Sequence, residues 1–175
     1  MIYELEDTSR VKGLFEGWQE TLITSCLQKV MGKIFEKNLL LLPDGYELKE
    51  IDSALYDKRL ENPVTADFVS SFQSKAAYLR DGRGVVVVKN GEVVSGASSY
   101  ARYREGIDIE VDTVEEERRK HLALIACSAL ILRCLDEGLY PSWDAQNMVS
   151  VRLAEKLGYQ FDHEYTAYSV AVPYR

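Results

Sequence analysis

Three carboxylates alternate along residues 107–113, a short run that is typical of a β-strand. Asp108, Glu110 and Asp112 occupy every second position, and apolar residues occupy the positions between them. Successive side chains of a strand point to opposite faces, so the three acids share one face, which is unusual in a helix-covered sheet. We select Glu110 as a candidate general base, acting directly or through a held water. The alternative is a partly solvated strand face near the open end of the sheet.

A basic turn, RRKHLA, occupies residues 118–123 and opens a long apolar run that predicts a buried helix over residues 118–137. The first N–H groups of a helix lack partners within it, and the helix dipole favours an anion there. The turn is therefore a candidate phosphate site. The predicted binding residues are Arg118, Arg119, Lys120, His121, Leu122 and Ala123. The alternative is an ordinary helix start with a solvated basic turn.

A second helix start lies at Asn147, in the run NMVSVRLAEKLGY of residues 147–159. Asn147 can cap this helix and also offer its side-chain amide to a ligand. Gly158 is expected to end the helix. The alternative is that Asn147 only caps, with Leu153 and Leu157 packing in the core.

These motifs resemble two signatures of the GNAT (GCN5-related N-acetyltransferase) superfamily. Residues 118–123 are similar to its pyrophosphate loop, Q/R-x-x-G-x-G/A, with His121 in place of the usual Gly. Residues 147–159 are similar to its N-x-x-A/S and A/Y-E-K-L-G-F/Y pattern. With the preceding PSWDA at 141–145, they resemble a bacterial GNAT subfamily that carries PSWDAxNxxSxxLAEKLGY. The resemblance covers most of residues 44–170.

The resemblance implies transfer of an acetyl group from acetyl-CoA to an amine of a small molecule or peptide, without a metal. Backbone N–H groups near Val111, Asp112 and Thr113 are then expected to polarise the thioester carbonyl. Asn147 and Ser150 are expected to lie beside the pantetheine arm.

The general acid of many family members, a Tyr, is replaced here by Ala154. We expect Tyr165 to substitute, with Tyr168 or Ser150 as alternatives. The thiolate can also leave without help, because a thiol pKa is only about 8–9.

His121 is the main departure from the family pattern, because a β-carbon disfavours positive φ and close approach to phosphate. We expect it to fit with a right-handed helical backbone. A second hypothesis is a degenerate GNAT module that binds acyl-CoA weakly for regulation or protein interaction. His121, the missing Tyr and a shortened N-terminal region favour it. A third, an α/β scaffold without cofactor, requires both motifs to be coincidental.

The elements that must position these residues follow from residue 46 onward: one strand, two helices, three strands, then helix, strand, helix and strand. Asn90-Gly91 predicts a hairpin, and the two helices before it are expected over residues 53–60 and 65–79. This order predicts an α/β fold with a mixed, mostly antiparallel sheet and helices on both faces.

The turn at Pro43-Asp44-Gly45 divides residues 1–42, an N-terminal helical segment, from an acetyltransferase domain of residues 43–175. Within the segment a helix is expected over residues 9–31. Its apolar stripe is expected to pack on the core or on a second copy of the chain in a homodimer.

The 175 residues carry a net charge of −7, with 46% hydrophobic residues. This charge excludes broad nucleic-acid binding and mildly favours a cationic acceptor. The apolar stretch 122–135 is too short to cross a membrane, and the start lacks a signal-peptide pattern. Cys26, Cys127 and Cys134 are odd in number and lack CxxC spacing, which indicates a reducing cytoplasm. The two histidines do not predict a metal site.

Overall fold

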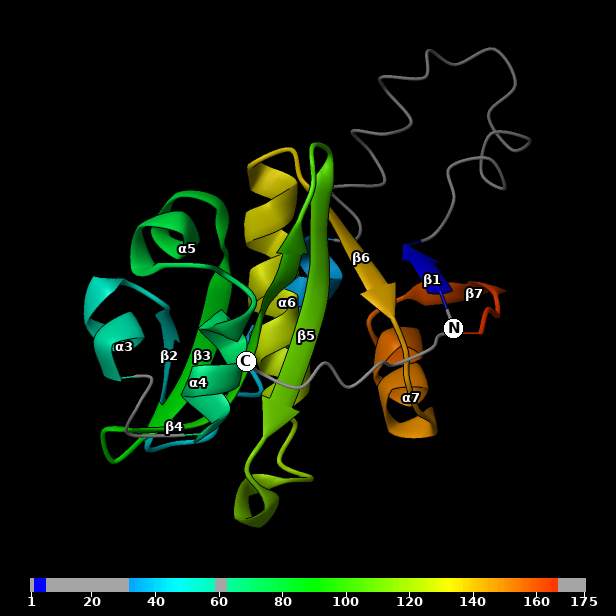
Figure 1. Cartoon of the computed structure of the whole chain (residues 1–175). Coiled ribbons are helices and arrows are strands. Elements are labelled where there is room, and N and C mark those ends of the chain that lie inside the picture. Colours follow the sequence, from blue (N-terminus) through cyan, green and yellow to red (C-terminus); the bar gives the residue numbers. More distant parts are fainter. Residues whose placement is uncertain (1, 6–31, 59–62, 167–175) are drawn as a thin grey trace.

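One seven-stranded sheet organises the structure, which is a computed structural model describing residues 2–5, 32–58 and 63–166 (Figure 1). The strand order is β2-β3-β4-β5-β6-β1-β7. All neighbours are antiparallel except β5 and β6, which are parallel. The strands are β1 (Ile2–Leu5), β2 (Tyr46–Glu50), β3 (Gly84–Lys89), β4 (Glu92–Arg102), β5 (Gly106–Thr113), β6 (Tyr140–Asp144) and β7 (Tyr159–His163).

Helices cover both faces of this sheet, and the alternation of β3 shows how. Val85 and Val87 pack in the core formed with α6 (Leu122–Asp136), whereas Val86 and Val88 pack against the helices of the opposite face. That face carries α3 (Ser53–Asp57), α4 (Pro63–Ser70) and α5 (Lys75–Asp81). The last helix in the described residues is α7 (Met148–Lys156), and its buried side chains join the α6 core. The predicted α/β fold, mixed sheet and two-sided helical cover are confirmed.

Local turn chemistry follows the sequence closely. Asn90 and Gly91 join β3 to β4 with φ of 52° and 86°, the left-handed region that this hairpin turn needs. Gly138 has φ of 69°, and the Leu139 N–H reaches the Cys134 carbonyl at 2.7 Å, so α6 ends in a Schellman-type cap. Cys127 and Cys134 are free thiols buried in the core, as small apolar residues would be.

Two predicted helices have different bounds. The expected helix over residues 65–79 is two helices, because the Ser74 hydroxyl accepts the Ala77 N–H and starts α5 anew. The helix expected from residue 118 begins at Leu122, after a short 3₁₀ turn, η2 (Glu115–Glu117). The helix predicted over residues 9–31 lies outside the described residues.

Two N-terminal segments contribute to the main body of the fold. Strand β1, which no sequence pattern predicts, lies between β6 and β7 and pairs with both. Residues 32–39 are helical, with Phe35 fully buried in the α6 core and Asn38 Nδ2 donating to Ser128 Oγ at 3.0 Å. The division at residue 42 stays a prediction. None of the helices in the described ranges has the length and apolarity needed to cross a bilayer.

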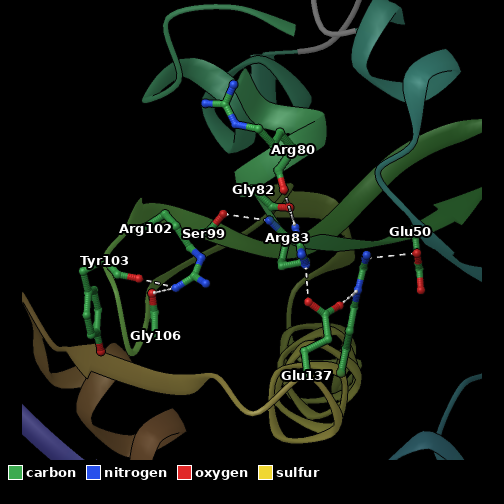
Figure 2. A network of polar contacts seen from close by, with 10 residues as sticks. Glu50, Arg80, Gly82, Arg83, Ser99, Arg102, Tyr103, Gly106 and Glu137 are labelled. Atoms are coloured by element: carbon green, nitrogen blue, oxygen red, sulfur yellow. Dashed lines mark hydrogen bonds and ion pairs between the residues drawn. The ribbon is translucent and has the colours of Figure 1, made fainter. Parts of the chain in front are cut away.

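An ion-pair network connects the C-terminal end of α6 to the sheet (Figure 2). Glu137 accepts from Arg83 at 2.6 Å and from Arg133 at 3.0 Å, and Arg133 also pairs with Glu50 of β2 at 3.0 Å. The cations offset the unfavourable placement of an acid at the negative end of the helix dipole. This network lies at the opposite end of α6 from the predicted anion loop.

Candidate active site

Strands β5 and β6 pair only at their beginnings and then separate (Figure 1). Their last register pair within the described residues is Asp108 with Ser142, whose hydroxyl also donates to the Ile107 carbonyl at 3.0 Å. Both strands then run toward the predicted motifs: β5 leads into the basic turn before α6, and β6 into Asn147 before α7. The carboxyl ends of two separating parallel strands thus bring both motifs to one end of the sheet.

The separated edge of β5 presents the backbone of Val111. The Ile107 carbonyl faces β6, and the Asp112 carbonyl faces β4, where it accepts from Ser95 Oγ at 3.1 Å. Backbone groups of alternate residues share one edge, so Val111 faces the β6 side. The Thr113 N–H donates to the Asp112 side chain at 2.7 Å, and its carbonyl accepts from Arg118 Nε at 3.2 Å. Of the three predicted donors, Val111 therefore has the N–H best placed for a ligand.

Glu110 differs from its two neighbouring carboxylates. Its Oε1 is buried and makes no hydrogen bond with any described residue. By contrast, Asp108 accepts from the Ser142 hydroxyl, and Asp112 is exposed and accepts from a backbone N–H. Burial, together with the negative charge of Asp67, raises the pKa of Glu110 to about 7. A carboxylate that exchanges its proton near neutral pH suits general-base catalysis.

The anion loop has an unexpected backbone. Arg119 and His121 both have left-handed φ, at 64° and 63°. The expected right-handed backbone at His121 is wrong, because the helix begins at Leu122 and His121 is its N-cap rather than a helical residue. His is one of the residue types that adopt this region more often than most. The chain thus keeps, without glycine, a backbone that glycine adopts readily.

The first turn of α6 offers N–H groups to a ligand. Ile125 N–H is the first to bond within the helix, reaching the His121 carbonyl at 3.0 Å, and His121 makes no side-chain cap. The N–H groups of Leu122 and Ala123 precede it and have no intrahelical acceptor. Exposed Arg119 adds positive charge beside them.

The positive charge of Lys120 is paired with a carboxylate of this chain. Its Nζ lies 2.6 Å from Glu117 Oε2, and Glu117 also accepts from Lys89 at 2.7 Å and from the Tyr46 hydroxyl at 2.5 Å. Hydrogen bonds from Lys120, Lys89 and Tyr46 lower the pKa of Glu117 to about 2. The basic turn therefore carries less uncompensated charge than its sequence indicates.

Asn147 caps α7, accepting at Oδ1 from Val149 N–H at 2.9 Å and Ser150 N–H at 3.0 Å. The predicted capping role is confirmed. The Ser150 hydroxyl accepts from Trp143 Nε1 at 3.1 Å, which ties α7 to β6. These bonds use Oδ1 of Asn147, so its amide N–H groups remain the part suited to a ligand carbonyl. Contact of Asn147 or Ser150 with pantetheine stays a prediction.

Tyr165 follows β7 in the chain, and its hydroxyl donates to the carboxylate of Asp144, the last residue of β6. This hydrogen bond raises the pKa of Tyr165, with a smaller contribution from burial. Its side chain is about half exposed, at 49%. No described contact joins it to Glu110, and its role as general acid stays a prediction. Tyr168 lies outside the described residues.

Several residues around the site have no sequence motif. Ser98, Asp67, Tyr46 and Lys89 come from four different elements, and only the folded sheet brings them to Glu110 or Glu117. Glu117 alone had a local signal, its spacing of three residues from Lys120. Among the residues that the structure describes, no group of three or more His, Cys, Asp or Glu is placed to hold a metal ion.

Known proteins match this chain over the region that contains the site. Residues 36–168 match the GNAT acetyltransferase family. The uncharacterized N-acetyltransferase YdfB of Bacillus subtilis (strain 168) is 31% identical over 134 residues, covering 75% of this chain and 51% of that protein.

Solved structures match the same region. A GCN5-related N-acetyltransferase-like protein from Streptococcus suis 89/1591 is 45% identical with a TM-score of 0.73, covering 75% of this chain and 53% of that one. An aminoglycoside acetyltransferase from an uncultured soil metagenomic sample, in complex with sisomicin, shares the fold at 11% identity and a TM-score of 0.55, over 74% of this chain and 97% of its own.

The chain thus spans about half the length of the two more similar relatives. The matched region contains the separated strands, the anion loop and the α7 cap. From this match, we conclude that the chain belongs to the GNAT acetyltransferase family.

Proposed function

We propose that this protein is an acetyl-CoA-dependent N-acetyltransferase that acts on a primary amine of a small molecule or peptide, with Glu110 as general base. The observation that carries the proposal is the buried, unpaired Oε1 of Glu110, on the strand that separates from β6. Burial and Asp67 raise the pKa of this carboxyl to about 7. At neutral pH a substantial fraction is ionised and able to take a proton from an ammonium acceptor.

The site fits a nucleotide thioester in two respects. The first-turn N–H groups of α6 follow a loop with two left-handed residues, and unpaired N–H groups at a helix start suit a pyrophosphate. At the separated edge of β5, the Val111 N–H is placed to donate a hydrogen bond to a pantetheine arm that lies along the strand. Acetyl-CoA supplies the acetyl group as a thioester, which is reactive toward an amine once the amine is deprotonated.

The residues divide the reaction between them. Glu110 removes a proton from the amine, directly or through water, and the amine nitrogen then forms a bond to the acetyl carbon. The Val111 N–H stabilises the negative charge that develops on the carbonyl oxygen as this bond forms, and the carbonyl re-forms as the bond to sulfur breaks. The thiolate takes its proton from Tyr165 or from solvent, and the nitrogen returns its second proton to the same group as the amide forms. The acidic surroundings of Glu110, including Asp67, favour a cationic acceptor.

The second candidate is a regulatory GNAT module that binds acyl-CoA weakly. One observation favours it: the Lys120 ammonium is engaged by Glu117, so the loop holds less free positive charge for phosphate. A calorimetric titration with acetyl-CoA, followed by CoA-release assays on polyamines, amino acids and aminoglycosides, separates the two. Binding with CoA release that Glu110→Gln removes supports the enzyme. Binding without release on any amine supports the module, and no binding contradicts the enzyme.

A further inference from the structure

We propose that Glu117 is a positioning residue: through Lys120 it holds the 118–121 loop in its anion-binding backbone before a ligand arrives. The identity of the ligand rests on the proposed function. The effect of Glu117 on the loop backbone does not rest on the proposed function, because Glu117 and the loop belong to this chain and contact each other without a ligand.

The loop needs such a restraint because its backbone is unfavourable for its sequence. Arg119 and His121 carry β-carbons, yet both have φ near 64°. Two left-handed residues on either side of one lysine are not a conformation that a free chain favours. Such conformations persist where the surrounding structure holds them in place.

Two side chains of the segment, Arg118 and Lys120, bond to residues outside it. Arg118 Nε donates to the Thr113 carbonyl at 3.2 Å, which fixes the entry to the loop against the end of β5. Lys120, between the two left-handed residues, reaches Glu117 at 2.6 Å and the Tyr46 hydroxyl at 3.3 Å. Because Lys120 lies between Arg119 and His121, loss of its contacts would let both left-handed residues relax.

Glu117 is itself fixed in position, because it is largely buried and three side chains donate hydrogen bonds to it. Its side chain is 11% exposed, and its two oxygens accept from Lys89 of β3, Tyr46 of β2 and Lys120. Lys89 also lies 5.0 Å from the centre of the Tyr46 ring, a cation–π contact. Through Glu117, the loop is therefore held in place by two strands of the sheet, β2 and β3, and not only by contacts within its own short turn.

This arrangement changes the expected role of Lys120. A lysine in a basic phosphate loop suggests a direct ion pair with the ligand. Here its ammonium shapes the loop, and the anion is left to the first-turn N–H groups of α6 and to Arg119. The two roles predict opposite effects of removing the Glu117 charge. A positioning residue would weaken binding when neutralised, whereas a competitor for Lys120 would strengthen it.

The test compares Glu117→Gln with Glu116→Gln, an exposed neighbour that undergoes the same change of charge. Hydrogen exchange of the peptide covering residues 118–123 is measured without ligand, and acetyl-CoA and acetyl-pantetheine are titrated by calorimetry. We expect Glu117→Gln alone to speed exchange in this peptide and to raise the Kd for acetyl-CoA about tenfold. The Kd for acetyl-pantetheine, which lacks the pyrophosphate, should stay unchanged.

Unchanged exchange, or unchanged or tighter binding of acetyl-CoA by Glu117→Gln, would overturn the proposal. If that variant loses its fold by circular dichroism, Lys120→Met provides the test, because it removes the tether and leaves Glu117 with Lys89 and Tyr46. It should loosen the same peptide, and protection equal to the unmodified protein would overturn the proposal. If the unmodified protein binds no acetyl-CoA, the proposed function fails, while hydrogen exchange still decides the role of Glu117.

Discussion

Glu110 lies directly opposite Ser98 in the β4–β5 ladder, yet the Ser98 hydroxyl donates to the Phe68 carbonyl at 2.7 Å instead. The Tyr78 hydroxyl, 3.2 Å from Ser98 Oγ, keeps its proton because burial raises its pKa to about 12. The neighbour best placed to stabilise an ionised Glu110 is thereby engaged with α4. Without a hydrogen bond from Ser98, nothing in this pair opposes the burial and the negative charge of Asp67 that raise the pKa of Glu110 to about 7.

Replacing Glu110 with Gln should lower kcat for acetyl transfer by about 10²- to 10⁴-fold, the usual contribution of a general base. In the unmodified protein, kcat/KM should rise with pH through an apparent pKa of about 7. The variant should lose this limb because its amide does not titrate. Glu92→Gln, at an exposed position of β4, serves as control. A variant with full activity would show that another group takes the proton.

The same substitution should stabilise the protein at alkaline pH. The pKa of Glu110 is higher in the folded protein than the ordinary 4.5, so the folded state binds more protons between pH 4.5 and about 7. Stability therefore falls as pH rises through this window. Glu110→Gln should raise Tm at pH 8 and have little effect at pH 4.5. Thermal melts of both proteins across this range provide the check, and an equal effect at both pH values would contradict it.

Replacing Asp67 with Asn should move the rate profile toward lower pH. Burial is the larger cause of the raised pKa of Glu110, and the negative charge of Asp67 adds to it. Without that charge the pKa of Glu110 should fall, though not to its ordinary value. The pH dependence of kcat/KM measures the shift, with Asp136→Asn, an exposed aspartate near the end of α6, as control. A profile shifted toward higher pH would exclude this electrostatic coupling.

Replacing His121 with Gly should stabilise the protein, in contrast to most glycine substitutions. The φ of 63° is unfavourable for a residue with a β-carbon, and its relief is worth about 1 kcal/mol. The greater freedom of glycine in the unfolded chain offsets part of this gain. Urea denaturation of His121→Gly and of Glu115→Gly, in the η2 turn, compares the two cases. We expect the first to gain stability and the second to lose it; similar losses would mean that no strain is stored at His121.

Replacing Glu137 with Gln should destabilise the fold by about 1 kcal/mol without affecting the site. It removes the acid that joins Arg83 to Arg133 at the end of α6 (Figure 2). Although burial opposes the shift, hydrogen bonds from the two arginines lower the pKa of Glu137, so the loss should be full at neutral pH and shrink on acidification. Thermal melts measure the loss, with Asp136→Asn as control.

Local patterns predicted much of this fold. Alternation located β5 and placed Glu110 on its polar face, and Asn90-Gly91, Gly138 and Gly158 marked turns with positive φ. These features depend on neighbours in sequence, which is why a pattern can identify them.

The parts that were missed depend on distant partners. Strand β1 has only four residues, and it forms by pairing with β6 and β7, which lie on either side of it in the sheet. The Glu117 cluster joins β2, β3 and the anion loop, and the sequence alone predicts Lys120 as a phosphate ligand because Tyr46 and Lys89 give no local signal. The left-handed His121 was missed because the predicted helix began four residues too early.

The position of β1 also bears on how the protein is made. Tyr3 pairs with Trp143 and with Phe161, so β1 waits for partners that are translated about 140 residues after it, a delay of roughly 7–30 s. Strands β2 to β5 are neighbours in sequence as well as in space and can associate during this interval. Until β6 and β7 are translated, β1 lacks both of its neighbours in the described sheet, and its edges are open to chaperones and to other polypeptides.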